Sequence, residues 1–310
     1  MADAPHPDPA LVFRTVRANS HRPTTPWFGS TAFRPPVARH GHLDFGAPPA
    51  AAEEFLLASR LHPHDREVAH SVREYLDESF LPVVAAIDTE AAPAAVDTEA
   101  APAAVELPAS VEPTARLCDL IATRRSARAF GGGPVGLPEL ATLVRACAGV
   151  TREPGDGVLP GRAVASGGAL YPVELWVLAL DVPGLDRGAY RYAPVRDVLA
   201  REGDAGVVAR FLREALLDLG EDSPVARCAA IGVLVARPWR SMRKYGPRGM
   251  RLTLHEVGAM SQQFHLTAGA LGLASTDWSS FYDVPANRAL GLDGLRHLVL
   301  HTVLLGRPAT

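Results

Sequence analysis

The sequence is poor in cysteine and has no long hydrophobic run. Its three cysteines, Cys118, Cys147 and Cys228, lie far apart and have no metal-type spacing. An odd and sparse set of this kind indicates a reducing compartment rather than a disulfide framework. No apolar stretch approaches the roughly 18 residues of a membrane span, and the first ten residues lack the basic and apolar regions of a signal peptide. We therefore expect a cytoplasmic protein.

The chain also lacks a large net charge. With 31 basic and 34 acidic residues, its formal net charge is −3. This balance gives no electrostatic argument for a nucleic acid or an anionic membrane as partner. The 310 residues, 47% hydrophobic and 21% charged, are typical of a globular protein. They suffice for one large domain, alone or with a smaller one.

A tandem repeat marks the clearest boundary along the chain. The nonapeptide DTEAAPAAV occupies 88–96 and again 97–105. Its prolines, Pro93 and Pro102, would each interrupt a helix. We predict a linker at 87–111, preceded by an N-terminal extension or small helical module at 1–86 and followed by the main domain at 112–310.

Helical and strand patterns intermix in the main domain. Apolar periodicity predicts helices at 138–150, 206–220 and 251–273. Buried or hairpin strands are predicted at 173–182, 188–194, 197–202, 228–237 and 297–306. The strict alternation of a doubly wound fold is absent, so the pattern favours an α+β domain with a sheet enclosed by helices.

Three arginines and a serine gather in the first segment that carries a chemical signal. Arg124, Arg125, Ser126 and Arg128 lie next to a predicted helix end. Guanidinium groups and a hydroxyl supply directed donors to a phosphate. Taken alone, a run of arginines is more often a solvated face.

A glycine pair precedes the predicted strand at 173–182. The segment runs Ser166, Gly167, Gly168, Ala169, Leu170. Two glycines let the backbone approach a flat ligand and expose N–H groups to its heteroatoms. A tight turn before a strand would need the same residues.

Lys244 and Tyr245 stand side by side in a predicted loop before the long helix. They offer a proton acceptor and a proton donor within a short reach. An exposed basic loop is the plainer interpretation. A further arginine, Arg307, follows the last predicted strand.

Together these segments resemble a known family. RRSARAF, SGGALYPVE, KYGPRG, the helix with Gln262 and Gln263 running into LTAGALGLAS, and the terminal GRP occur in the order found in nitroreductase-like flavoproteins. SGGALYPVE followed by GLDRGAYRYAP resembles the SagB-type dehydrogenases in particular. The resemblance covers roughly 112–310. It implies a central, mainly antiparallel sheet enclosed by helices, an FMN cofactor and a homodimer with FMN at the subunit interface.

The resemblance also assigns roles to individual residues. The phosphate and ribityl chain of FMN would be held by the arginine loop and the chain end, through Arg124, Arg125, Ser126, Arg128 and Arg307. The glycine segment would line the isoalloxazine ring with Ser166, Gly167, Gly168, Ala169 and Leu170. Ala274 and Ser275 would lie near the other end of the ring, and Lys244 and Tyr245 would be the catalytic pair.

The SagB-type resemblance implies a reaction. Oxidation of a thiazoline or oxazoline ring to an azole removes two electrons and two protons, and FMN would accept the hydride. Burial beside the flavin and Arg248 would lower the pKa of Lys244 and make it a base, and Tyr245 would relay a proton. The substrate would be a ribosomally made peptide, handled within a cyclodehydratase complex.

Two other functions remain open at this point. One is an NAD(P)H-dependent nitroreductase or ene-type reductase, which differs in the direction of electron flow. The other is a flavin-binding scaffold without turnover. We expect no metal site, because the His255–Glu256 pair lacks the second histidine of a zinc motif: position 259 is Ala. The glycines at 131, 133 and 136 match a dinucleotide fingerprint in spacing only, since no strand precedes them.

Overall fold

A computed structural model describes residues 55–56, 58–60, 104–113, 115–152, 161–216 and 223–309. The chain divides into two compact units, Met1–His62 and Pro63–Thr310. All elements named below belong to the second unit. The predicted boundary between 86 and 87 and most of the tandem repeat lie outside the described residues.

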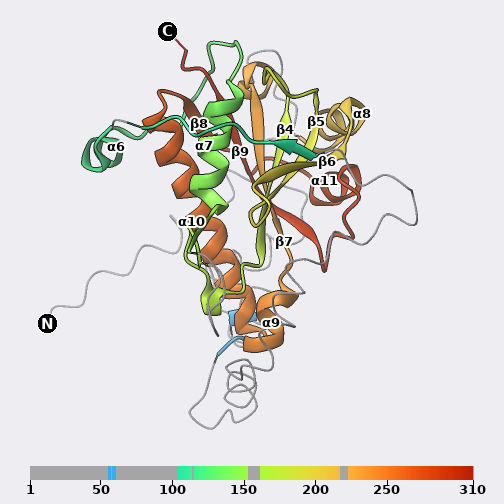
Figure 1. Cartoon of the computed structure of the whole chain (residues 1–310). Coiled ribbons are helices and arrows are strands. Elements are labelled where there is room, and N and C mark those ends of the chain that lie inside the picture. The colour runs from blue at the N-terminus through green and yellow to red at the C-terminus, as the bar shows by residue number, and fades with distance from the viewer. Residues whose placement is uncertain are drawn as a thin grey trace, which may run out of the picture. The chain divides into compact units, whose positions relative to one another are not determined.

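A seven-stranded sheet forms the centre of this unit (Figure 1), with the strand order β1-β6-β5-β4-β7-β9-β8. Every neighbouring pair is antiparallel. The strands are β1 (Ala104–Glu106), β4 (Val173–Ala179), β5 (Gly188–Ala193), β6 (Val198–Gly203), β7 (Ala230–Ala236), β8 (Ala274–Asp277) and β9 (Leu298–Gly306). The predicted α+β class is confirmed. A separate pair joins β2 (Val150–Arg152) to β3 (Gly161–Arg162).

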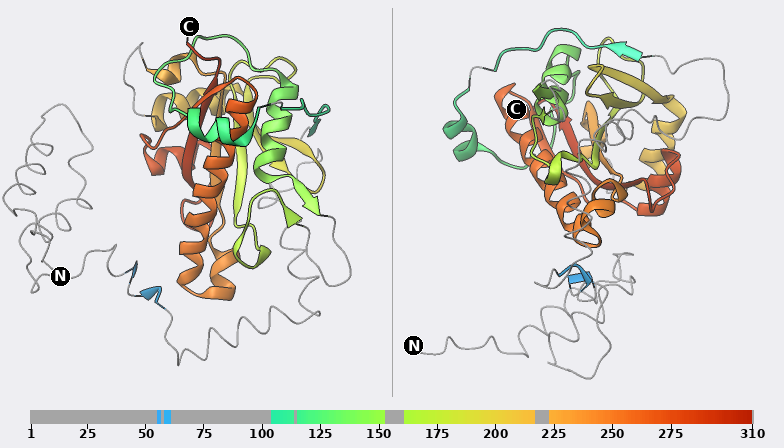
Figure 2. Two further views of the ribbon diagram at one scale, coloured as in Figure 1. Left: turned by 90° about the vertical axis from the view of Figure 1, so that its left-hand side faces the viewer. Right: turned by 60° about the horizontal axis from the view of Figure 1, so that its bottom comes forward.

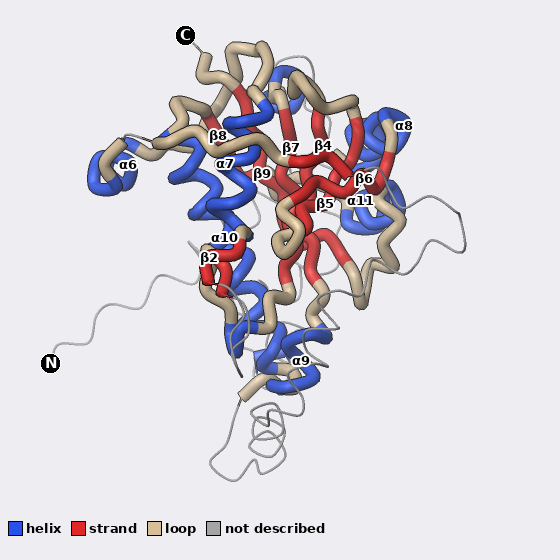
Figure 3. The backbone as a smooth tube through the Cα atoms, viewed as in Figure 1, coloured by secondary structure: helices blue, strands red, loops and turns tan. Residues whose placement is uncertain are grey.

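Helices surround the sheet on both sides, as Figures 2 and 3 show. They are α6 (Leu117–Thr123), α7 (Leu137–Ala148), α8 (Ala205–Arg210), α9 (Trp239–Tyr245), α10 (Arg248–Ala270) and α11 (Asp283–Ala289). Short turns of other helical types are η3 (Gly167–Ala169), η4 (Phe211–Ala215) and η5 (Pro224–Arg227). Within the described residues, no helix has the length and apolar character that crossing a membrane requires.

The central strands are buried on both faces, which explains their continuous apolar sequences. Along β4, Leu175 and Val177 face a core shared with α7 and α10. The intervening residues Trp176 and Leu178 face a second core, shared with α8, η4 and α11. Because side chains alternate along a strand, one sheet supports two cores.

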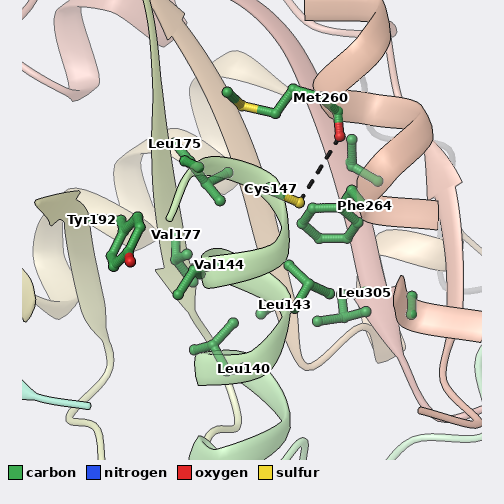
Figure 4. Packing of buried hydrophobic residues seen from close by; sticks show 14 of the residues in the cluster. Leu140, Leu143, Val144, Cys147, Leu175, Val177, Tyr192, Met260, Phe264 and Leu305 are labelled. Atoms are coloured by element: carbon green, nitrogen blue, oxygen red, sulfur yellow. Dashed lines mark hydrogen bonds between the residues drawn. The ribbon is translucent and has the colours of Figure 1, made fainter. Parts of the chain in front are cut away.

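Helix α10 packs tightly on the sheet. Phe264 is 1% exposed and lies in the same cluster as Cys147 of α7 and Leu305 of β9 (Figure 4). Gly232 of β7 lies directly opposite, because a Cβ atom there would stand 2.7 Å from the Phe264 ring. The glycine therefore lets the aromatic ring reach the sheet backbone.

Two predicted segments differ from the structure. The helix predicted at 206–220 is α8, which begins after its N-cap Asp204 and passes into the π-helical turn η4, ending at Ala215. Residues 217–222 lie outside the described residues. The last part of the predicted linker, Ala104–Glu106, is the edge strand β1, paired with β6. Because β1 has only three residues, its sequence shows no alternation of apolar and polar residues that would predict a strand.

Replacing Phe264 with Ala should remove the main contact between α10 and the sheet. We expect the free energy of unfolding to fall by about 3–5 kcal/mol, because the sheet cannot close the cavity left behind. Denaturant titration measures this loss. His255→Ala is the matched control on the exposed face of the same helix, with an expected change of less than about 0.5 kcal/mol. Equal losses in both variants would contradict this packing account.

Candidate functional site

The arginine loop and the residues after α10 form one wall of a pocket. The Ala127 N–H donates to the Ser275 carbonyl oxygen at 3.0 Å, which ties the loop after α6 to strand β8. A pocket of about 500 Å³ opens beside this bond. Basic and apolar side chains both line the pocket. The basic ones are Arg124, Arg125 and Arg128, and the others include Leu120, His265, Leu266, Gly269, Leu273, Ala274 and Ser275. Two separate predictions from the sequence, the arginine loop and Ala274–Ser275, thus meet in one place.

The three arginines of the loop differ in their partners. Arg125 donates to the carbonyl oxygens of Ala122 and Arg124, at 3.1 and 2.8 Å, and so caps the end of α6. Arg124 contacts the Ser126 hydroxyl at 3.5 Å. Arg128 makes no hydrogen bond or ion pair with any described residue, so its guanidinium group is available to a ligand. Ser126 itself is exposed and is not part of the pocket wall.

Arg307 points away from the pocket. Its guanidinium group forms a paired contact with both carboxylate oxygens of Glu139, each at 2.8 Å, and also donates to the Pro134 carbonyl. Glu139 in turn accepts a hydrogen bond from the Gly136 N–H and caps α7. The arginine therefore joins the end of β9 to the start of α7, and Pro308 and Ala309 line the pocket in its place.

The glycine segment adopts the left-handed backbone conformation at three of four successive positions. The φ angles are 68° at Gly168, 54° at Ala169 and 44° at Tyr171. Each non-glycine residue in this region costs about 1–2 kcal/mol. Strain of this kind persists where the surrounding structure enforces it, and such residues cluster at functional sites.

Lys244 and Tyr245 pack against this strained segment. A Cβ atom at Gly168 would overlap the Tyr245 hydroxyl and lie 3.1 Å from Lys244 Nζ. The pair belongs to the last turn of α9, not to a loop as the sequence pattern indicated. That prediction was wrong because Pro247 and Gly246 suggested an irregular segment. The structure does join the predicted catalytic pair to the predicted glycine segment.

Burial changes the acidity of this pair. Lys244 is only 6% exposed, and burial lowers the pKa of its ammonium group below the usual value. Burial raises the pKa of the Tyr245 phenol in the same way. Both shifts favour the neutral form of the side chain.

A buried ion cluster holds α9 in position. Glu174 of β4 contacts Arg237 at 2.9 Å and His297 at 3.1 Å. Burial alone would raise the pKa of Glu174, but the His297 hydrogen bond and the charges of Arg237 and Arg240 lower it to about 2. Arg240 also donates to the Tyr171 carbonyl oxygen at 3.1 Å. The start of α9 is thereby fixed to the sheet and to the strained segment.

The buried carboxyl group of Glu256 lies beneath the glycine segment. It is 1% exposed, and its Oε1 accepts a hydrogen bond from the Val173 N–H at 3.2 Å. Oε2 makes no hydrogen bond among the described residues. Burial raises the pKa of Glu256 to about 7. The carboxyl group is therefore partly protonated near neutral pH.

These two groups of residues lie at opposite ends of α10. Leu252, in its first turns, is the neighbour of Gly167, whereas Gly269, near its last residue, is the neighbour of Leu120 of α6 and lines the arginine pocket. The 17 residues between them span about 25 Å along the helix axis. In Figure 1, α9 accordingly lies at the lower end of α10, and α6 and β8 lie near its upper end. Within one chain the arginine pocket and the Lys244–Tyr245 pair do not meet.

A family model describes this chain well. The model of the nitroreductase family matches residues 121–307, which is more than half of the sequence. The chain belongs to the nitroreductase family. The matched range contains both ends of α10 and hence both groups of site residues.

Similar proteins agree with this assignment. A nitroreductase-family protein of Methanocaldococcus jannaschii is 34% identical over 168 residues, which cover 54% of this chain and 80% of that protein. The crystal structure of a nitroreductase-family protein of Ralstonia eutropha superposes with a TM-score of 0.53 at 22% identity, over 70% of this chain and 93% of that one. The nitroreductase-like fold predicted from the sequence is thus confirmed.

Two further relatives have names that concern peptide processing. The trifolitoxin-processing protein TfxB of Rhizobium leguminosarum is 32% identical over 129 residues, or 40% of this chain. The microcin B17-processing protein McbC of Escherichia coli is 26% identical over 136 residues, or 43% of this chain. The chain spans about a third of the length of TfxB and about half of that of McbC.

Sequence analysis missed several polar residues at the site of this nitroreductase-family protein. His265 lines the pocket beside Ser275, which the sequence did single out, and Asp277 and His301 join these two residues in one network of polar contacts. Glu256 was noted only as half of a failed zinc motif. The sequence of α10 carries a weak signal for these residues, because polar side chains recur on the helix face that is otherwise apolar and buried. They are Thr253, Glu256, Ser261, His265 and Thr267.

Glu256 should make stability depend on pH. Its pKa is raised from 4.5 to about 7, so the folded state prefers the protonated form and loses stability as pH rises through this interval. Relative to Glu256→Gln, the wild-type free energy of unfolding should fall by about 3 kcal/mol between pH 4 and pH 8. Denaturant titrations at several pH values measure this difference. Parallel pH curves for the two proteins would mean that Glu256 does not titrate in this range.

Proposed function

We propose that this chain is an FMN-dependent dehydrogenase of the SagB type, which oxidises azoline rings of a ribosomally made peptide. In this proposal the protein acts as a homodimer within a cyclodehydratase complex. Each FMN lies between the arginine pocket of one subunit and the Lys244–Tyr245 pair of the other. The observation that carries the proposal is the position of these two groups at opposite ends of α10, because only a second copy can bring them together.

The exposed surface supports a dimer of this kind. Helix α6 has no buried residue, and its apolar side chains Leu117 and Ile121 are 60% and 61% exposed. Leu254 on α10 is 46% exposed. A seven-residue helix is not stable by itself in water, so α6 needs a packing partner. The second subunit would supply that partner beside the arginine pocket.

The residues of the pocket fit a flavin mononucleotide. Arg124 and Arg128 would hold the phosphate through charge-assisted hydrogen bonds, and Arg125 adds positive charge while it caps α6. The exposed Gly168 backbone, kept free of a side chain, would let the flat ring approach Ser166, Gly167, Ala169 and Leu170 of the other subunit. Arg307 would not contact the phosphate, because its guanidinium group is paired with Glu139.

The chemistry divides between cofactor and protein. FMN, when bound, would supply the acceptor for a hydride, which carries both electrons and one of the two protons. Lys244, whose pKa is lowered by burial, would take the remaining proton from the ring carbon of the substrate. Tyr245, whose raised pKa keeps the phenol protonated at rest, would release its proton toward solvent as it accepts one from Lys244. The strained Gly168 segment would fix the position of both side chains.

Two observations support a peptide substrate. The segments SGGALYPVE and GLDRGAYRYAP match the SagB-type pattern, and two relatives are named for the processing of peptides. One observation favours a different function. The relative with the highest identity of the three, from M. jannaschii, belongs to the nitroreductases, which suits a reductase that takes electrons from NAD(P)H. The two functions differ in the direction of electron flow.

An anaerobic absorbance experiment distinguishes these functions. We expect the purified protein to carry FMN, and the flavin bands to bleach when a thiazoline-containing peptide is added but not when NADPH is added. Prompt bleaching by NADPH would establish the reductase instead. A protein without flavin bands after incubation with FMN would refute both. Bound flavin that no donor reduces would indicate a scaffold without turnover.

Mixing two inactive variants tests the shared site. We expect Arg128→Ala to lose FMN, and Lys244→Ala to retain FMN but lose turnover. If each site combines two subunits, half of the randomly mixed dimers have one intact site, and turnover should return to about a quarter of the wild-type value. The measurement is the rate of azole formation after subunit exchange.

The control for this experiment is a mixture of Lys244→Ala with Tyr245→Phe. Both changes lie at the same end of α10, so no intact site can form and turnover should stay at background. If the first mixture also stays at background although mass spectrometry detects mixed dimers, the site does not cross between subunits.

A further inference from the structure

A chain of close polar contacts leads from the wall of the arginine pocket into the protein. His265 Nδ1 lies 2.8 Å from the Ser275 hydroxyl oxygen, and His265 Nε2 lies 3.1 Å from Asp277 Oδ1. His265 and Ser275 both line the pocket, yet they are only 5% and 6% exposed. The network therefore reaches the wall of the pocket at Ser275.

Asp277 is the negative end of this network. Its Oδ1 atom also contacts His301 Nε2 at 2.7 Å and accepts a hydrogen bond from the Ser261 hydroxyl at 2.6 Å. The hydrogen bonds from His265 and His301 hold the pKa of this carboxyl group well below its usual range. Asp277 is thus ionised at neutral pH. Within the described part of the chain, no three His, Cys, Asp or Glu residues are placed to hold a metal ion.

The protonation state of His265 decides what Ser275 offers to a ligand. In neutral His265, the Nε2–H faces Asp277, and Nδ1 must accept the Ser275 hydroxyl hydrogen. If His265 gains a proton, Nδ1–H donates to the Ser275 oxygen instead. The hydroxyl hydrogen is then free to donate into the pocket, which is the arrangement that an anion needs.

Charges around the pocket couple the protonation of His265 to the binding of an anion. The charged groups that face His265 are Asp277 from β8 with its partner His301 from β9, and Arg124, Arg125 and Arg128 from the loop after α6. Without an anion, the three arginines disfavour another positive charge. A phosphate group in the pocket reverses that effect, and Asp277 then stabilises the imidazolium.

We infer that Asp277, His265 and Ser275 form a proton-linked relay, which takes up a proton from solvent when a phosphate-bearing cofactor binds and directs the Ser275 hydroxyl toward it. This role rests on the proposed binding of FMN. In this role Ser275 contacts the ligand directly. His265 and Asp277 act through Ser275 and are positioning residues.

Calorimetry tests the relay without any turnover. FMN is titrated at pH 7.5 into the apo form of the full-length protein in two buffers with different enthalpies of ionisation, and the difference gives the protons taken up per FMN bound. The same titration uses riboflavin, which lacks the phosphate. The variants are His265→Gln, Asp277→Asn and Ser275→Ala. His297→Gln is the matched control, because His297 also contacts a carboxylate, Glu174, through Nε2 at 3.1 Å but does not line the pocket.

We expect the wild type and His297→Gln to take up a measurable fraction of a proton with FMN and none with riboflavin. His265→Gln and Asp277→Asn should lose this uptake. Ser275→Ala should bind FMN about tenfold more weakly and riboflavin as the wild type does. Equal proton uptake by wild type, His265→Gln and Asp277→Asn, with FMN bound by all three, would overturn the relay alone. Absence of FMN binding by the wild type would overturn the proposed function together with the relay.

Discussion

The packing of one face of α10 against the central sheet is the constraint on which the rest of the molecule depends. Phe264 reaches the sheet backbone only because Gly232 has no side chain, and this contact fixes the helix along its length. A helix held in this way is a rigid spacer. It separates the arginine pocket from the Lys244–Tyr245 pair by about 25 Å, so a single chain holds these two groups of residues apart.

The two ends of the spacer have opposite electrostatic characters. At the α6 end, guanidinium groups line the pocket, and the carboxylate of Asp277 contacts His265 of the pocket wall. At the α9 end, burial lowers the pKa of Lys244 and raises that of Glu256, so it favours the neutral form of each. The α6 end therefore suits the binding of an anion, and the α9 end suits the transfer of a proton. The proposed flavin dehydrogenase would require both.

The sequence predicted the strands of the core well because their apolar runs are long and the turns between them carry glycine and proline. It did not predict β1, whose three residues give no periodic signal, or the helical position of Lys244, which depends on the anchoring of α9 through Arg237 and Glu174. The role expected of Arg307 illustrates the same limit. Its position after the last strand was correct, but Glu139, distant in sequence, takes up its guanidinium group.

The sequence by itself determined the α+β class and the membership of the nitroreductase family, and it singled out the segments proposed to carry chemistry, because these depend on local patterns and ordered motifs. Only the tertiary structure decided which segments meet. It joined Ala127 to Ser275 and Gly168 to Lys244, and it separated these pairs by the length of α10. It also assembled His265, Asp277 and His301 from three elements. Contacts of this kind arise from packing between residues far apart in the chain, for which a single sequence has no local signal.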